Sequence, residues 1–180
     1  MATALNADTW KYNPDCFKWG KYKPVNWEML VIHCSATPAS KDIGVDWIDY
    51  EHRKRGFTAV GYHYVIRRDG TVEKGRPDNI PGAHASGFNL RGLGICMVGG
   101  LDAKLKPQDN FTPEQYASLK RLVLALLVKF PHITKVVGHR DLSPDLNHDG
   151  IISSTEWMKV CPCFEVKDWL KKEDIILDGL

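Results

Sequence analysis

Residues 29–34 read Met-Leu-Val-Ile-His-Cys, an apolar run that carries a histidine near its end. A run of this length and content predicts a buried strand. Residues 35–42 follow as a loop, punctuated by Pro38. His33 is therefore expected at the C-terminal end of a strand, where α/β domains commonly place the residues of a functional site.

Further predicted strands and helices follow this run along the chain. The turn Arg68-Asp69-Gly70 joins two short strands into a hairpin. Thr112 begins the clearest helix, because Thr-Pro-Glu-Gln supplies an N-cap hydroxyl, a proline at the first helical position and a capping-box glutamine. The expected helices cover residues 45–55, 112–130 and 165–172, and the expected strands cover residues 29–34, 62–66, 71–74, 93–98 and 136–138. This order predicts an α/β fold: a single domain with a central mixed β-sheet flanked by helices.

Length and composition fit one catalytic domain, predicted over residues 28–180 of the 180-residue chain. Residues 1–27 lack clear periodicity and are interpreted as an N-terminal arm whose Trp10, Phe17 and Trp19 pack on the domain or on a partner. The net charge of +2 is too small to predict a nucleic-acid-binding face. The apolar run 122–128 is too short to cross a bilayer, so no membrane insertion is expected. Residues 1–22 show no signal-peptide pattern, so synthesis in the cytoplasm is expected.

Histidine and cysteine side chains at the ends of predicted elements suggest a metal site. His33 ends one strand, His139 follows another, and Cys161 comes after a loop and directly precedes Pro162. Two imidazoles and one thiolate can form a three-ligand zinc site with a fourth position left for water, which is the catalytic type of site. Spacing alone is a weak signal, because a single histidine is more often structural. Cys163 leaves a cysteine-rich structural site as an alternative, although the odd count of five cysteines favours one ligand in this segment.

Five segments, in the same order along residues 29–170, carry a resemblance to a known family. They are residues 31–37 (Val-Ile-His-Cys-Ser-Ala-Thr), 60–71 (Val-Gly-Tyr-His-Tyr-Val-Ile-Arg-Arg-Asp-Gly-Thr), 82–85 (Gly-Ala-His-Ala), 94–100 (Gly-Ile-Cys-Met-Val-Gly-Gly) and 159–162 (Lys-Val-Cys-Pro). Together they resemble the type 2 N-acetylmuramoyl-L-alanine amidases, and most of all the phage lysozyme-type members, which are relatives of the peptidoglycan recognition proteins.

The resemblance implies a zinc-dependent enzyme that hydrolyses the amide bond between N-acetylmuramic acid and L-alanine in bacterial peptidoglycan. It implies zinc ligands at His33, His139 and Cys161, with Tyr62 and Lys159 beside them as catalytic residues. Lys159 would place a cation against the developing oxyanion, and the Tyr62 hydroxyl would orient the water or the carbonyl. Taken singly, Tyr62 fits a core aromatic and Lys159 a surface charge.

Three other histidines receive less specific interpretations. His84, in Gly-Ala-His-Ala, resembles a family segment that lines the substrate groove, so it is expected to contact the substrate. His63 should face away from Tyr62 if both lie in a strand, which suggests a structural part. His52 is expected on the surface of its helix.

Residues 145–156 fit the twelve-residue EF-hand calcium loop. The pattern supplies glycine at position 6, an aliphatic residue at position 8, and calcium ligands at Asp145, Asn147, Asp149, Ile151, Ser153 and Glu156. The alternative is an acidic turn. The preceding residues 140–144 end in proline and cannot form a long entering helix, so we predict an isolated loop. Its calcium would be structural, holding Lys159 and Cys161 at the correct distance from His139.

Other functions remain as alternatives to a peptidoglycan amidase. Recognition proteins of the same superfamily often bind peptidoglycan without zinc, but their usual mark is loss of the cysteine ligand, and Cys161 is present. Some phage lysozymes of the family inhibit a phage RNA polymerase, a role to which the arm 1–27 does not obviously correspond. A glycosidase would need a pair of carboxylates, and none stands out beside the histidines. An endolysin-like enzyme made in the cytoplasm would reach the wall after export or holin-type release.

Overall fold

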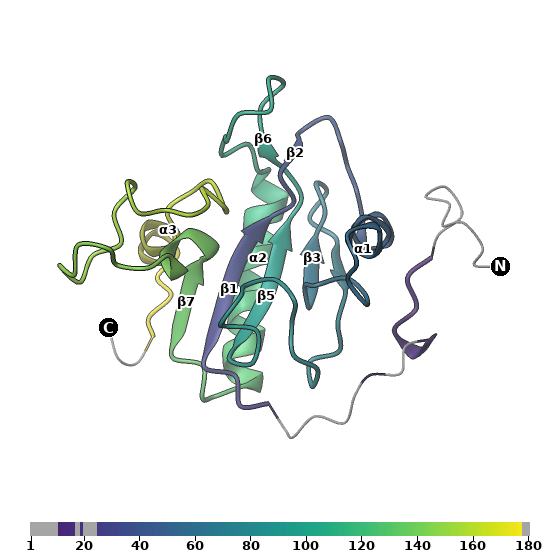
Figure 1. Cartoon of the computed structure of the whole chain (residues 1–180), viewed down its shortest axis with the longest axis horizontal. Coiled ribbons are helices and arrows are strands. Elements are labelled where there is room, and N and C mark those ends of the chain that lie inside the picture. Colours follow the sequence, from purple (N-terminus) through teal and green to yellow (C-terminus); the bar gives the residue numbers. More distant parts are fainter. Residues whose placement is uncertain (1–10, 17–18, 20–24, 178–180) are drawn as a thin grey trace.

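The predicted strand at residues 29–34 forms β1 (Met29–Cys34), which lies inside a five-stranded sheet in a computed structural model that describes residues 11–16, 19 and 25–177. The strand order is β4-β3-β5-β1-β7 (Figure 1). The other strands are β3 (Tyr64–Ile66), β4 (Val72–Lys74), β5 (Gly92–Met97) and β7 (Lys135–Gly138). β1 pairs in parallel with β5 and β7, and β4 alone runs antiparallel to its neighbour β3. The predicted mixed sheet is confirmed.

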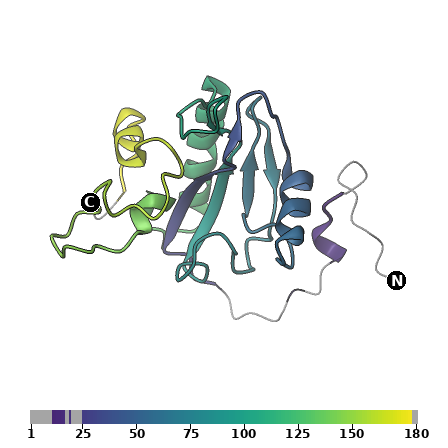
Figure 2. The ribbon, with the colours of Figure 1, turned by 45° about the horizontal axis from the view of Figure 1, so that its top comes forward.

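The two faces of the sheet are covered by different helices, as Figures 1 and 2 show. Leu30 and Ile32 of β1 point to one face, where they join a core cluster that includes Leu119 and Val123 of α2 (Pro113–Lys129) and residues of α3 (Val166–Lys172). On the opposite face, α1 (Val45–Lys54) packs Ile48 against a smaller cluster. Because side chains alternate along a strand, His33 lies on the face opposite Leu30 and Ile32.

The start of α2 follows its predicted cap. The Thr112 hydroxyl accepts a hydrogen bond from the Gln115 amide at 3.1 Å, and the Gln115 side chain accepts one from the Thr112 amide at 3.1 Å. The Gln115 amide group also donates to the carbonyls of Ile66 and Val98. The capping box therefore fixes the helix end to two neighbouring strands of the sheet.

Two local predictions differ from the structure. The strand expected over residues 62–66 begins only at Tyr64, because the carbonyls of Tyr62 and His63 accept hydrogen bonds from the amides of Arg76 and Gly75, which lie beyond the end of β4. The loop expected over residues 35–42 contains β2 (Thr37–Pro38), which pairs in parallel with β6 (Gly100–Leu101). This pairing joins segments more than sixty residues apart, so local patterns do not reveal it.

Part of the predicted N-terminal arm packs on the domain. Residues 14–16 form the short 3-10 helix η1 (Pro14–Cys16), and the Tyr12 hydroxyl donates to the Gly75 carbonyl at 2.8 Å. The Tyr12 amide and the Lys11 ammonium both bond to Asp46 of α1. Trp19 donates to the Pro14 carbonyl, whereas Trp10 and Phe17 lie outside the described residues. No helix within the described ranges is long and apolar enough to cross a membrane.

Candidate active site

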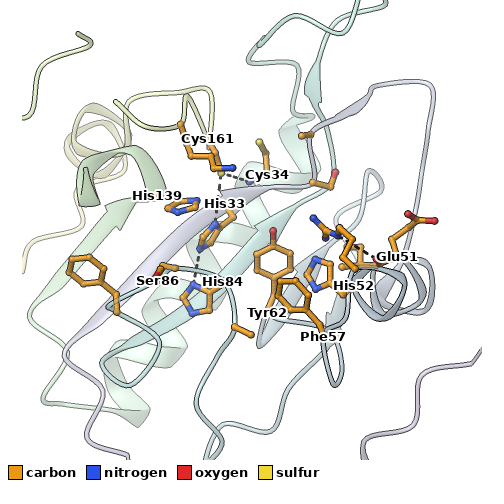
Figure 3. A pocket seen from close by; sticks show the side chains of 18 of the residues that line it. His33, Cys34, Glu51, His52, Phe57, Tyr62, His84, Ser86, His139 and Cys161 are labelled. Carbon is orange, nitrogen blue, oxygen red and sulfur yellow. Dashed lines mark hydrogen bonds between the residues drawn. The ribbon is translucent and has the colours of Figure 1, made fainter. Parts of the chain in front are cut away.

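Three predicted ligands from distant segments meet at the C-terminal end of β1. The ligand atoms of His33, His139 and Cys161 all lie within 4.8 Å of one another. The Cys161 Sγ is 3.9 Å from His33 Nδ1, and the rings of His33 and His139 are 4.5 Å apart between centroids. Figure 3 shows the three side chains turned toward one another. This is the one such group of metal-ligating side chains found among the residues that the structure describes.

The backbone around Cys161 explains how the third ligand reaches the other two. β7 ends at Gly138, His139 begins the short 3-10 helix η2 (His139–Leu142), and the Arg140 amide donates to the Cys161 carbonyl at 2.9 Å. The Cys34 amide donates to the Cys161 Sγ at 3.2 Å. A methyl group on Gly138 would lie 2.7 Å from the Pro162 ring, so only glycine lets the two segments approach this closely.

His84 lies behind His33 and fixes the orientation of its ring. His84 Nδ1 is 2.9 Å from His33 Nε2, and His84 Nε2 is 3.0 Å from the Gly92 carbonyl. A carbonyl can only accept, so His84 Nε2 carries a proton and its Nδ1 accepts the proton of His33 Nε2. We assign these tautomers from the hydrogen bonds. His33 then presents its unprotonated Nδ1 to the Cys161 thiol and to a metal.

The imidazoles are neutral at pH 7, which is the form that binds metals. Burial, followed by the nearby His84, His139 and His63, lowers the pKa of His33 well below its ordinary value. Burial lowers the pKa of His84 to about 3. Burial and the positive charge of Lys159 lower the pKa of His139.

A slot between two glycines holds the His84 ring. A methyl group added to Gly94 of β5 would lie 2.6 Å from His84 Cδ2, and one added to Gly82 would lie 2.3 Å from the same atom. β5 pairs Gly94 with Val31, on the same face of the sheet as His33. Gly82 of the Gly-Ala-His-Ala segment and Gly94 of β5 therefore act together, because the absence of a side chain at both positions makes room for the His84 ring.

Tyr62 and Lys159 both line a cavity of about 490 Å³ that is also lined by the three metal-ligating side chains. Figure 3 shows Tyr62 in this cavity with His33, His139 and Cys161. The Tyr62 ring lies 5.1 Å from the His33 ring, between centroids. Burial, and then the neighbouring cysteines, raise the pKa of Tyr62 well above its ordinary value, so its hydroxyl is a neutral donor. Lys159 is exposed at the cavity rim. His84 also lines this cavity.

The expectation that His52 lies on the surface of its helix is wrong. Its side chain is buried in the cavity wall, where Nδ1 accepts the Gly61 amide proton at 2.9 Å and the ring stands 5.4 Å from that of Tyr62. Burial lowers its pKa to about 4. The same wall is lined by Glu51 of α1 and by Arg55, the residue that caps the C-terminal end of α1. The only local signal was position on the apolar side of α1, between Ile48 and the helix end.

Cys34, Cys96 and Cys163, the other cysteines whose side chains the structure describes, do not join the group of metal-ligating side chains. Cys163 Sγ lies 3.9 Å from Cys34 Sγ and 3.2 Å from the Gly100 carbonyl. Hydrogen bonding with Cys161, together with burial, raises the pKa of Cys34 to about 12, so this thiol stays protonated. His63 is fully buried and bonds to the Gly94 amide and the Ile80 carbonyl. None of residues 145–156 lines the cavity.

The chain is similar in sequence to one family of known proteins. A sequence model of the N-acetylmuramoyl-L-alanine amidase family matches residues 22–163. The endolysin of Klebsiella phage KP32 is 40% identical over 147 residues, which cover 82% of this chain and 87% of that protein. The endolysin of Escherichia phage T7 is 38% identical, over 83% of this chain and 89% of its own.

Solved structures share the fold. The N-acetylmuramoyl-L-alanine amidase LysC from Clostridium intestinale gives a TM-score of 0.65 at 28% identity, covering 87% of this chain and 96% of LysC. The Drosophila peptidoglycan recognition protein PGRP-LB gives a TM-score of 0.56 at 23% identity, covering 77% of this chain and 75% of that one, and so shares the fold alone. On the strength of the sequence match over most of its length, the chain belongs to the N-acetylmuramoyl-L-alanine amidase family.

Proposed function

We propose that this amidase is zinc-dependent and hydrolyses the amide bond between N-acetylmuramic acid and L-alanine in bacterial peptidoglycan. The observation that carries the proposal is the meeting of His33, His139 and Cys161 in the lining of the cavity, with ligand atoms within 4.8 Å of one another. Two nitrogens and one sulfur suit zinc, and three protein ligands are the number found in catalytic sites. When bound, zinc would supply Lewis acidity toward a water molecule and toward the carbonyl of the scissile amide.

The chain's own residues would stabilise the charge that develops on the carbonyl oxygen. Lys159 stands at the cavity rim, close enough to His139 for its charge to lower the pKa of that imidazole. Its ammonium group is proposed to lie against the oxyanion. The neutral Tyr62 hydroxyl is proposed to donate a hydrogen bond to the same oxygen or to orient the attacking water. Each such donor typically contributes a factor of about 10²–10³ in rate.

We propose a positioning role for His84, in place of the direct substrate contact predicted from the sequence. Its Nδ1 faces His33 Nε2, and its Nε2 is occupied by the Gly92 carbonyl. Both ring nitrogens are therefore engaged inside the protein. The part of His84 would be to keep His33 in the tautomer and orientation that bind zinc.

The proposed substrate is peptidoglycan, because the chain belongs to the N-acetylmuramoyl-L-alanine amidase family and its relatives include phage endolysins. The proposed place of action is the cell wall, reached by export or by holin-type release. Residues 28–180 are proposed as the catalytic domain, with residues 1–27 as an arm. Neither nucleic acid nor RNA polymerase has a part in the proposal. Calcium would have no part in the chemistry, because residues 145–156 do not line the cavity.

The test follows the release of new L-alanine amino termini from purified peptidoglycan. Wild type, Cys161→Ser and Cys163→Ser are compared, each after chelation and again after zinc is restored. Cys163 is the matched control, because it lies two residues from Cys161 and is not a member of the metal-ligating group. Wild type and Cys163→Ser should release amino termini when zinc is restored, and Cys161→Ser should not.

The alternative to an enzyme is a module that only binds peptidoglycan. If zinc-loaded wild type sediments with peptidoglycan but releases no amino termini, the catalytic proposal fails and the binding module takes its place. Full activity of the chelated protein, without zinc, would refute the proposed cofactor instead.

A further inference from the structure

The loop between His139 and Cys161 has the internal hydrogen bonds of an EF-hand loop as well as its sequence. The Asp145 Oδ2 accepts the amide proton of Gly150, five residues later, at 2.8 Å. The Asn147 Oδ1 accepts from the Asp149 amide at 3.1 Å, and the Asp149 Oδ1 accepts from the Ile151 amide at 2.8 Å. Gly150 has a φ of +82°, which glycine adopts without strain, as position 6 of the loop requires.

One carboxylate oxygen in this loop is buried and has no partner. The Asp145 Oδ1 is shielded from solvent and accepts no hydrogen bond from any described residue, while Oδ2 of the same group is bonded to Gly150. A buried carboxylate oxygen without a donor is costly unless a cation lies against it. Position 1 of an EF-hand loop supplies such an oxygen to calcium.

A second carboxylate, that of Glu156, is turned into the loop and is only 7% exposed. Its oxygens accept hydrogen bonds from the amides of Leu146, Asn147 and Ser153 and from the Ser153 hydroxyl. Those from Ser153 first, and then from Leu146, lower the pKa of Glu156 to about 2. Glu156 is therefore charged at neutral pH.

No positive charge balances these groups within the part of the chain that the structure describes. None of its ion pairs includes Asp145, Asp149 or Glu156. Three carboxylates thus share a twelve-residue loop, two of them with buried oxygens. A hard divalent cation bound by oxygen ligands would neutralise them.

Three observations support a cation here: the buried Asp145 Oδ1 has no donor, the Glu156 carboxylate is buried, and none of the described ion pairs includes a carboxylate of the loop. We infer that residues 145–156 bind one calcium ion, at a place separate from the zinc site. The ligands would be the side chains of Asp145, Asn147, Asp149, Ser153 and Glu156, with the Ile151 carbonyl at position 7. Calcium would have to displace amide hydrogen bonds from Glu156 and the 2.9 Å contact between Asn147 Nδ2 and Asp149 Oδ2. This competition places the expected Kd at roughly 10⁻⁴ M, in the range of extracellular calcium modules.

The loop is joined to the active site at both of its ends. The Met158 amide donates to the Ser143 hydroxyl at 3.0 Å, and the Arg140 guanidinium lies 4.1 Å from the centroid of the Trp157 ring. Lys159 and Cys161 follow directly along the chain. Calcium would therefore restrict the segment that carries the third zinc ligand without contacting the substrate.

The first experiment titrates calcium chloride into the full-length, zinc-loaded protein by calorimetry. Wild type should bind one calcium, and magnesium chloride should bind at least tenfold more weakly. Glu156→Gln and Asn147→Ala should each weaken calcium binding at least tenfold; Asn147 is exposed, so the second variant does not depend on a buried change. Asp168→Asn is the control, because that carboxylate is 73% exposed on α3, outside the loop, and its loss should leave the affinity unchanged.

A second measurement uses terbium(III) as the probe, with excitation of tryptophan and detection of terbium luminescence. Trp157 adjoins the loop, so wild type should sensitise terbium, calcium should compete it away, and Trp157→Phe should lose most of the signal. The inference is overturned if wild type binds no calcium at millimolar concentration, or if Glu156→Gln and Asn147→Ala both bind it as wild type does. Neither outcome depends on turnover, so a failure here is separate from a failure of the proposed amidase reaction.

Discussion

Replacing His84 with alanine tests whether this residue positions a metal ligand or contacts the substrate. The change removes the acceptor that His33 Nε2 faces at 2.9 Å and the donor to the Gly92 carbonyl. Without that acceptor, the His33 ring is free to rotate or to place its proton on Nδ1, the nitrogen that faces Cys161. Zinc would then bind a smaller population of correctly oriented rings.

The expected loss of zinc affinity follows from the role of His84 as the hydrogen-bond partner of a zinc ligand. Losing such a partner typically lowers metal affinity by about 10–100-fold, which is about 1.4–2.7 kcal/mol. His84→Asn should recover part of this loss, because its Oδ1 takes the place of the ring Nδ1 as an acceptor. We therefore expect zinc affinity to be highest in wild type, intermediate in His84→Asn and lowest in His84→Ala.

The assay is a zinc competition against a chromophoric chelator, followed by amidase turnover at saturating zinc. His84→Ala should show a weaker zinc Kd and recover most of its turnover when zinc is saturating. If the variant binds zinc as tightly as wild type but has lost turnover, His84 acts on the substrate, as the sequence resemblance predicted, and the positioning argument is wrong.

Three other changes test neighbouring parts of the structure. Gly94→Ala places a methyl group 2.6 Å from the His84 ring, so it should reproduce the weaker zinc binding of His84→Ala in the same competition. Lys159→Met should lower kcat by about 10²–10³-fold. Zinc should bind to this variant at least as tightly as to wild type, because the positive charge near His139, which lowers the pKa of that imidazole, is removed. A kcat equal to that of wild type would refute the role of Lys159 at the oxyanion. Burial holds the pKa of His63 at about 4 in the folded protein, against roughly 6.5 when unfolded. As the pH falls, the unfolded chain therefore takes up the proton first. The contribution of neutral His63 to the free energy of unfolding is fully present above pH 6.5 and is lost between pH 6.5 and about 4, a total of about 3 kcal/mol. Urea unfolding of metal-free wild type and His63→Asn across that range should show a shallower decline in the variant.

The sequence predicted correctly those strands and helices that are marked by a pattern within their own residues. β1 is a continuous apolar run, and α2 carries its own cap at Thr112, so both agree with the structure within a residue or two. The pairing of β2 with β6 was missed because it depends on contacts between distant segments. The surface position predicted for His52 was wrong for a similar reason: its hydrogen bond to Gly61 depends on the loop that packs under α1.

The site was only partly predictable from residue types. The positions of His33, His139 and Cys161 after predicted elements suggested the group, but only the family resemblance made it specific, since their spacing matches no short pattern. The contact between His33 and His84 spans 51 residues and depends on the missing side chains of Gly82 and Gly94. A glycine pair that makes room for a ring has no recognisable sequence signature, so this part required the structure.

The distance along the chain between the proposed ligands has a consequence for synthesis. His33 and Cys161 are 128 residues apart, and His139 follows β7, which pairs directly with β1. A ribosome-bound chain therefore carries the first ligand long before the other two exist. Because domains generally fold as units, the metal-ligating group can be completed only after Cys161, at position 161 of 180, has emerged. Chains that end before Cys161 would thus lack the third ligand of the proposed zinc site, and under the proposed function they would not hydrolyse peptidoglycan.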